Sequence, residues 1–167
     1  MNNTDSFIGR EDYKKQMDIF FSYEQQNVAL VYGRRRVGKT QLIKHCISLT
    51  NMLSIYYECK ETSEENNVKS LSEIVSEAFA FPPLSFDSME QLLDFVFKQA
   101  LQKDVILVLD EYPYLNKIIA GLDSIIQSLI DTYKDCSHLH LILCGSYVDT
   151  MKSLVEKQNP LYGKCKR

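Results

Sequence analysis

The residues best suited to chemistry lie in one short segment, Gly33 to Thr40, which fits the pattern G-x-x-x-x-G-K-[ST]. Its glycines tolerate the backbone angles that let successive N–H groups point at one phosphate. The helix expected to begin here adds its positive N-terminal end. Lys39 can reach the β- and γ-phosphates of a nucleotide, and the Thr40 hydroxyl can ligate Mg²⁺. The nucleotide-binding residues predicted from this segment are Gly33, Arg34, Arg35, Arg36, Val37, Gly38, Lys39, Thr40 and Gln41.

An acidic pair supplies the second half of the predicted site. The apolar run Val105 to Leu109 is followed directly by Asp110 and Glu111. A strand that ends in this way places Asp110 near Mg²⁺, and Glu111 can then polarise the water that attacks the γ-phosphate. Alone, such a pair often marks only a strand that enters a solvated loop. Together with the glycine loop it predicts a metal ligand, Asp110, and a catalytic base, Glu111.

A third apolar run, Leu141 to Cys144, leads through glycine to Ser146. A polar side chain there can lie between the attacking water and the γ-phosphate, so Ser146 joins Lys39 and Glu111 as a predicted catalytic residue. The alternative is a simple helix cap, because serine favours such positions.

Other polar residues give weaker signals. One of Arg34, Arg35 and Arg36 can contact phosphate or an acidic residue of a partner; the alternative is a solvated run of charge. No histidine has a metal-like cluster around it. His138 and His140 alternate at the start of a strand, which favours a structural role.

The elements that must position these residues follow from the apolar patterns. Short apolar runs alternate with helical patterns, which predicts a parallel sheet with crossover helices. The predicted strands are Val28 to Tyr32, Leu53 to Glu58, Val105 to Leu109 and Leu139 to Cys144. Helices are predicted at about residues 10–25, 40–49, 68–79 and 89–103, with a short one that ends near residue 157.

Several local features refine this assignment. The polar stretch Glu61 to Asn67 is expected to be a surface loop, and Pro82-Pro83 is expected to end the preceding helix. The clearest amphipathic stripe predicts core packing on the sheet, and it consists of Leu115, Ile118, Ile119, Leu122, Ile125, Ile126, Leu129 and Ile130.

Composition excludes several classes of protein. The chain has 167 residues, enough for one domain with a core, and a formal net charge of −3. This acidity argues against a general nucleic-acid binder, because phosphate backbones are held by excess Lys and Arg. No apolar run approaches the roughly 18 residues that span a bilayer, and no secretion signal is visible. The five cysteines form no C-x-x-C pair, so we expect reduced thiols and a cytoplasmic protein.

The motifs resemble the prokaryotic archaeal-type ATPase family, within the AAA-like and STAND-like branch of P-loop proteins. The matching segments are Phe7 to Glu11, Val31 to Thr40, Leu109 to Leu115, Cys144 to Ser146 and Asn159 to Gly163. They are spread over nearly the whole chain. The triple-arginine loop and the sequence Asp-Glu-Tyr-Pro-Tyr-Leu are much more specific than the generic motifs.

The resemblance implies ATP as the nucleotide and an α/β three-layer sandwich with a mostly parallel sheet of strand order 5-1-4-3-2. It also implies that Phe7 and Ile8 lie near the adenine; the alternative is a hydrophobic staple at a helix start. The family usually has arginine after Leu-Tyr-Gly, where this chain has Lys164 and Cys165. Lysine lacks the bidentate fork of arginine. Only four core strands are counted, so we expect a domain of residues 1–167 that lacks the fifth strand and the lid.

Three functions follow as hypotheses. The first is an ATPase that binds ATP with Mg²⁺ and cleaves the γ-phosphate with water. The second is a nucleotide-dependent switch with little hydrolysis that acts through a protein partner or a second copy of itself. The third, a DNA-processing factor, rests on family analogy alone. Glu111 favours the enzyme, the missing lid favours the switch, and the acidic isoelectric point of about 5.6 counts against DNA.

Overall fold

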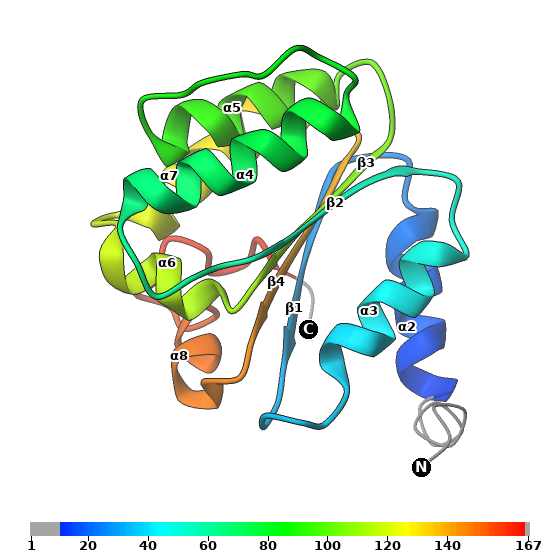
Figure 1. The fold of residues 1–167 in the computed structure, drawn as a ribbon. Coiled ribbons are helices and arrows are strands. Elements are labelled where there is room, and N and C mark those ends of the chain that lie inside the picture. The colour runs from blue at the N-terminus through cyan, green and yellow to red at the C-terminus, as the bar shows by residue number, and fades with distance from the viewer. Residues whose placement is uncertain (1–10, 166–167) are drawn as a thin grey trace.

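The computed structural model describes residues 11–165 and contains one four-stranded parallel sheet (Figure 1). Its strands are β1 (Asn27–Tyr32), β2 (Leu53–Glu58), β3 (Val105–Asp110) and β4 (Leu139–Gly145), in the order β1-β4-β3-β2. The central strands β3 and β4 are buried along their whole length, as expected when helices cover both faces of a parallel sheet. This confirms the predicted α/β P-loop fold, and the order equals the expected 5-1-4-3-2 without its fifth strand.

Helices cover both faces of the sheet (Figure 1). Helices α2 (Glu11–Ser22) and α3 (Lys39–Ser48) lie on one face; α4 (Glu64–Ala78), α5 (Met89–Gln99) and α7 (Leu122–Tyr133) lie on the other. Strand periodicity divides the core between them. Ile106 and Val108 pack with the α2–α3 layer, whereas Leu107 and Leu109 pack with the opposite layer. Two short helices, α6 (Tyr112–Ile118) and α8 (Val148–Ser153), follow β3 and β4 directly.

The prediction of a surface loop over Glu61 to Asn67 is wrong in its second half, because α4 begins at Glu64. Ser63 caps the helix: its side chain accepts a hydrogen bond from the backbone N–H of Asn66. Asn67 is buried, although its residue type suggested exposure. The polar run therefore marks a capped helix start, whose polarity resembles that of a loop.

Asn67 is buried because all four of its side-chain hydrogen bonds are made. Its Oδ1 accepts from the Tyr57 hydroxyl at 2.6 Å and from the Lys60 N–H at 3.0 Å. Its Nδ2 donates to the carbonyl oxygens of Lys60, at 3.1 Å, and Ser63, at 2.9 Å. This amide therefore joins β2, the following loop and the first turn of α4.

We predict that Asn67→Ala lowers the free energy of unfolding by about 2–4 kcal/mol, because several buried polar groups lose their partner at once. The matched control is Asn66→Ala, which removes an exposed side chain that donates to Thr62. Its cost should stay within about 0.5 kcal/mol. Urea denaturation of the two variants measures both values, and equal costs at the two positions would contradict the proposed importance of Asn67.

Other element ends also differ from prediction. Helix α4 ends at Ala78, before Pro82-Pro83, because Ala80 has a left-handed φ of 55° that cannot continue a helix. The helix predicted over about 89–103 ends at Gln99. The amphipathic stripe is divided between α6 and α7, which are separated at Gly121 with φ of 73°. Its residues are buried or half-buried in the core around the sheet, as predicted.

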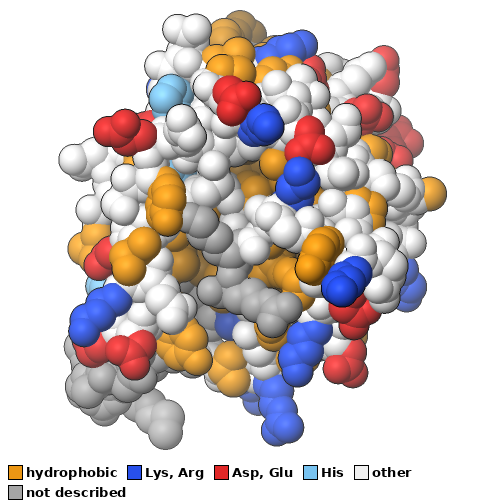
Figure 2. Space-filling model, turned by 180° about the vertical axis from the view of Figure 1, so that it is seen from behind, with side chains coloured by type: hydrophobic (Ala, Val, Ile, Leu, Met, Phe, Trp, Pro, Cys, Tyr) orange, Lys and Arg blue, Asp and Glu red, His pale blue; other side chains and the backbone are white. Residues whose placement is uncertain are grey.

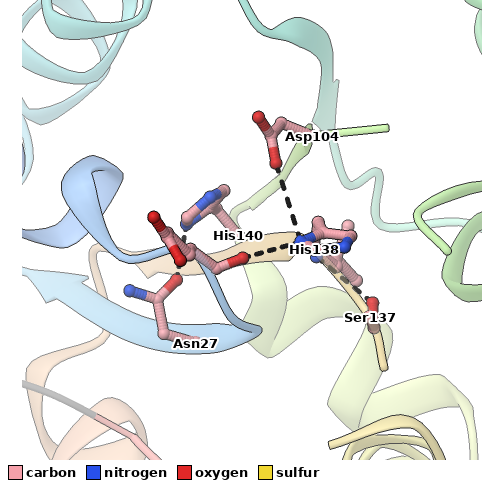
Figure 3. Close-up of polar contacts among 7 residues, drawn as sticks. Asn27, Asp104, Ser137, His138 and His140 are labelled. Atoms are coloured by element: carbon pink, nitrogen blue, oxygen red, sulfur yellow. Dashed lines mark hydrogen bonds and ion pairs between the residues drawn. The ribbon is translucent and has the colours of Figure 1, made fainter. Parts of the chain in front are cut away.

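His140 in β4 and His138, which precedes this strand, make structural contacts (Figure 3). His140 is buried, and its Nδ1 lies 2.6 Å from the side-chain oxygen of Asn27 at the start of β1. The Nδ1 of His138 lies 2.7 Å from the Glu24 carbonyl oxygen and 3.9 Å from a carboxylate oxygen of Asp104. These contacts join the α2–β1 connection to β4, at the end of the sheet opposite the glycine loop, which agrees with the predicted structural role.

Strand β1 forms one edge of the sheet, since it pairs with β4 alone among the described strands. A cavity of about 460 Å³ between α2 and this strand is lined mainly by hydrophobic side chains, including the exposed Tyr13 and Ile19. Seen from behind, the molecule shows hydrophobic side chains gathered around a hollow (Figure 2). We predict that the edge of β1 favours association with a second chain, because an edge strand presents backbone N–H and C=O groups that can pair with another strand. Within residues 11–165, no helix is both long and apolar enough to cross a bilayer.

Candidate nucleotide site

The predicted phosphate loop joins the end of β1 to the start of α3, as its motif requires. Gly38 caps the helix with φ of 83°, a left-handed angle that favours glycine. Gly33 has no such angle, and its role is space: a Cβ there would lie 3.3 Å from Val37 Cγ2. Arg36 carries the other left-handed angle, φ of 65°, which the sequence pattern did not predict. A non-glycine residue in this conformation stores strain, as is common at functional sites.

Lys39 is buried, and its ammonium group folds back onto the loop. Its Nζ donates to the carbonyl oxygens of Gly33, at 2.8 Å, and Arg34, at 2.9 Å. An ammonium group has three donors, so one N–H remains for a further acceptor. Two of the loop residues named from the sequence, Gly33 and Arg34, thus act here through their carbonyl groups.

Thr40 and Asp110 lie together, 70 positions apart in the chain. The Thr40 hydroxyl donates to Asp110 Oδ2 at 2.9 Å, and the Tyr56 hydroxyl donates a short hydrogen bond to the same oxygen. Asp110 is buried at the end of β3, and its Oδ1 accepts from the backbone N–H of Glu111 at 2.8 Å. Burial raises the pKa of the Tyr56 phenol far above its usual value, and its hydrogen bond to Asp110 adds to the shift. Tyr56 therefore stays a neutral donor.

Glu111 begins α6 in the left-handed conformation, with φ of 54°. The Ser146 hydroxyl donates to its Oε1 at 2.7 Å, while its Oε2 is buried without a hydrogen-bond partner among the described residues. Gly145 permits this approach, because a Cβ at that position would lie 2.9 Å from Pro113 and 2.8 Å from Met151. The ends of β3 and β4 thus hold a carboxylate with one oxygen hydrogen-bonded and the other without a partner in the described structure.

These groups surround a cavity of about 630 Å³, lined by Arg35, Arg36, Val37, Gly38, Lys39, Thr40, Gln41, Glu58, Glu111, Tyr114 and Ser146. The structure thus brings together most of the residues predicted from the sequence. Gly33, Arg34 and Asp110 adjoin the cavity without lining it. Phe7 and Ile8 lie outside the described residues. Lys and Arg side chains gather at the lower end of the view in Figure 2, the end at which the β1–α3 loop lies in Figure 1.

Sequence reasoning did not identify Tyr56, Glu58 or the placement of Tyr114. Tyr56 and Glu58 are two residues apart on β2, so they share a face of the sheet. Glu58 pairs in register with Asp110, which places it at the same carboxyl edge. The sequence did hold a signal for placing Glu58 near the site: β2 was predicted to end at Glu58, and neighbouring parallel strands end at the same edge of a sheet. The pattern alone could not show that β2 is the neighbour of β3.

Two family segments have structural roles around Asp123. Its Oδ1 accepts from the Tyr112 hydroxyl at 2.5 Å and from Asn116 at 2.6 Å, and its Oδ2 accepts from Asn159 at 2.9 Å. Burial raises the pKa of the Tyr112 phenol well above its usual range. The Asp-Glu-Tyr-Pro-Tyr-Leu motif therefore combines site residues with an anchor for the segment that begins at Asn159.

Lys164 follows Leu161-Tyr162-Gly163, where the resemblance led us to expect arginine. Its ammonium group lies 2.6 Å from a carboxylate oxygen of Asp131 in α7, and both side chains are partly exposed. Lys164 does not line the nucleotide cavity. The described structure thus gives Lys164 no arginine-like role at the site.

Comparison with solved structures agrees with this fold. The chain is similar to the Walker-type ATPase of Pyrococcus abyssi, with a TM-score of 0.61 and 20% identity, over 93% of this chain and 51% of that one. It is also similar to Cdc6p from Pyrobaculum aerophilum, with a TM-score of 0.67 and 16% identity, over 96% of this chain and 45% of that one. At these identities the likeness shows the shared fold.

The sequence comparisons add a relative and a family. The chain is 28% identical over 159 residues to an uncharacterized protein of Methanocaldococcus jannaschii, covering 95% of this chain and 34% of that protein. It thus spans about a third of that relative and about half of the P. abyssi ATPase. The model of the family described as ATPase domains predominantly from Archaea matches residues 7–167. With its phosphate loop, acidic pair and parallel sheet now described, the chain belongs to this family of ATPase domains.

Proposed function

We propose that this chain binds ATP with Mg²⁺ in the cavity at the β1–α3 loop and hydrolyses the γ-phosphate. One observation carries the proposal. Lys39 and Thr40 from the loop, Glu111 after β3 and Ser146 after β4 all line the same cavity of about 630 Å³. A cation, a hydroxyl, a carboxylate and a polar orienting group are the set that γ-phosphate cleavage needs.

Phosphate binding rests on the loop and on Lys39. Backbone N–H groups at the start of α3 and the positive end of the helix favour an anion in the cavity. Lys39 already has two of its three donors on the carbonyl groups of Gly33 and Arg34. Its remaining N–H can bind a phosphate oxygen without loss of those contacts.

The donor set near the loop fits Mg²⁺. Thr40 Oγ1 and Asp110 Oδ2 lie 2.9 Å apart beside the cavity, and both are hard oxygen donors. Among the described residues no group of three or more His, Cys, Asp or Glu side chains could hold a metal ion. Two protein oxygens suit Mg²⁺, which is commonly held by one or two side chains together with substrate phosphates. When bound, Mg²⁺ would neutralise charge on the phosphates.

Hydrolysis is assigned to Glu111. Glu111 lines the cavity, Ser146 holds its Oε1, and its buried Oε2 has no hydrogen-bond partner within the described structure, so this carboxylate is suited to accept the proton of an attacking water. The bond that forms joins the water oxygen to the γ-phosphorus, and the bond that breaks joins the γ-phosphorus to the β–γ bridging oxygen. The products are ADP and inorganic phosphate.

A nucleotide-dependent switch is the second candidate, and the position of Glu111 favours it. This residue begins α6 in a left-handed conformation, and its partner Ser146 lies just before α8. A change in the Glu111–Ser146 hydrogen bond on nucleotide binding would therefore act directly on two helices. Multiple-turnover phosphate release distinguishes the candidates. Sustained turnover supports the enzyme, whereas tight ATP binding with less than one turnover supports the switch.

We predict that Asp110→Asn lowers the ratio of ATP affinity in Mg²⁺ to ATP affinity in EDTA at least about tenfold, because the neutral amide is a much poorer ligand for the metal. The amide oxygen can still accept from Thr40 and Tyr56, while the Glu111 N–H loses its acceptor, so circular dichroism must first show that the variant is folded. Calorimetric titrations with ATP in Mg²⁺ and in EDTA measure the effect. Asp87→Asn, an exposed residue before α5, is the control and should match the wild type. Equal Mg²⁺ dependence in the Asp110 variant would remove this residue from the metal site.

A further inference from the structure

One group at the mouth of the nucleotide cavity bears on which of the three loop arginines contacts phosphate. It consists of Arg35 from the loop, Tyr114 from α6 and Tyr147 before α8, here called the arginine clamp. Arg35 Nη2 donates to the Tyr114 hydroxyl at 3.1 Å, and its guanidinium carbon lies 5.8 Å from the centre of the Tyr147 ring. The two rings meet edge to face at 5.9 Å. Three separate segments thus hold one cation.

The arginine clamp is built on the same two chain segments as the proposed base. The backbone N–H of Tyr114 donates to the Glu111 carbonyl oxygen at 3.0 Å, and Tyr147 directly follows Ser146. Two bridges therefore join the start of α6 to the end of β4: the Ser146–Glu111 hydrogen bond and the contact between the tyrosine rings. The guanidinium group is consequently fixed relative to the Glu111 carboxylate.

Charge explains why a cation is needed there. Glu58 and Glu111 both line the cavity, so a γ-phosphate that enters meets two carboxylates. Lys39 is occupied in part by the loop carbonyls, as described above. A second permanent cation beside Glu111 would offset this repulsion. Arg35 lines the cavity and keeps four N–H donors besides the one used by Tyr114.

The two tyrosines reduce the rotamer entropy that Arg35 loses when a ligand binds. A free arginine side chain loses rotamer entropy when it is immobilised, and Arg35 is exposed. A hydrogen bond and a cation–π contact restrict it before a ligand arrives. Arg36 also lines the cavity, but no hydrogen bond or ring contact is seen for its guanidinium group within the described structure.

We propose that Arg35 recognises the γ-phosphate of ATP and that Tyr114 and Tyr147 are the residues that position it. The inference rests on the proposed binding of ATP in this cavity. Under this proposal, the arginine that distinguishes ATP from ADP belongs to the phosphate loop of this chain. Arg35 is assigned the contact with the nucleotide, whereas the two tyrosines act through Arg35.

The experiment compares calorimetric affinities for ADP and for a non-hydrolysable ATP analogue, both with Mg²⁺. Arg35→Ala should lose about tenfold or more in affinity for the analogue, as expected for one charge-assisted hydrogen bond, and less than about threefold for ADP. Tyr114→Phe, which removes only the hydroxyl that binds Arg35, should show the same selective loss at a smaller size. A purely structural tyrosine would affect both nucleotides equally.

Two further variants complete the test. Lys117→Ala is the control, because it removes a cation from α6, the helix that contains Tyr114. The Lys117 ammonium group lies 3.6 Å from a carboxylate oxygen of Glu61 and does not line the cavity, so both affinities should match the wild type. Equal loss for ADP and the analogue in Arg35→Ala, or a selective loss in Arg36→Ala instead, would overturn the assignment of Arg35 while nucleotide binding itself stands. A wild-type protein that binds neither nucleotide would overturn the proposed function, and this inference with it.

Discussion

Lys39→Ala is expected to lower the affinity for ATP at least about a hundredfold. The substitution removes the charge that faces the β- and γ-phosphates, together with the charge-assisted hydrogen bond of the remaining Lys39 N–H, which alone contributes about 1.5–3 kcal/mol. Among the described residues that line the cavity, Lys39 is the only buried cation, whereas Arg35 and Arg36 are exposed. Calorimetry with ATP and Mg²⁺ measures the change directly.

The variant must be shown to fold, because Lys39 also binds the carbonyl groups of Gly33 and Arg34. Circular dichroism and urea denaturation provide that check. The control is Lys15→Ala, an exposed lysine of α2, which should bind ATP like the wild type. A folded Lys39→Ala protein with unchanged affinity would refute the nucleotide site at this loop.

Glu111→Gln is expected to separate binding from chemistry. The amide oxygen of glutamine can still accept the hydrogen bond from Ser146, so the side chain should keep its position. The amide nitrogen then replaces Oε2 and cannot accept a proton. Turnover should fall by about 10²–10⁴, as is typical when a general base is lost, while ATP affinity stays within about threefold.

Phosphate release under multiple-turnover conditions measures this effect, and calorimetry supplies the affinity. Glu90→Gln, at the exposed first turn of α5, makes the same chemical change away from the cavity and should leave turnover unaltered. Steady turnover in Glu111→Gln would mean that another group accepts the proton. Lost affinity would instead mean that Glu111 supports binding, which favours the switch over the enzyme.

The sequence predicted the strands well because each strand is a short apolar run with a clear boundary. Leu53 to Glu58 was predicted with the same bounds as β2, and β3 extends the predicted run only by Asp110. Helix ends were less predictable. The start of α4 contains the polar residues Glu64 to Asn67, and polarity alone does not distinguish a capped first turn from a loop. The four hydrogen bonds of Asn67 are made with residues of β2 and of the loop that follows it.

The glycine loop and the acidic pair could be predicted because their chemistry depends on local sequence. Consecutive residues form a phosphate loop, and a strand followed by Asp-Glu directs two carboxylates to one end of the sheet. Tyr56 could not be assigned in this way. Its hydrogen bond to Asp110 exists only because β2 lies beside β3, and that neighbour relation is set by the packing of the crossover helices.

By itself, then, the amino-acid sequence determined the fold class, the phosphate loop and the identity of the acidic pair, because these depend on residue type and on spacing within short segments. Only the tertiary structure decided the use of each side chain. It paired Ser146 with Glu111 across 35 positions and Arg35 with Tyr114 across 79. It also turned Tyr112 into the core and Tyr114 to the cavity mouth, two positions apart on one helix. Such contacts depend on the order of strands in the sheet and on close packing at their carboxyl ends, which no local pattern encodes.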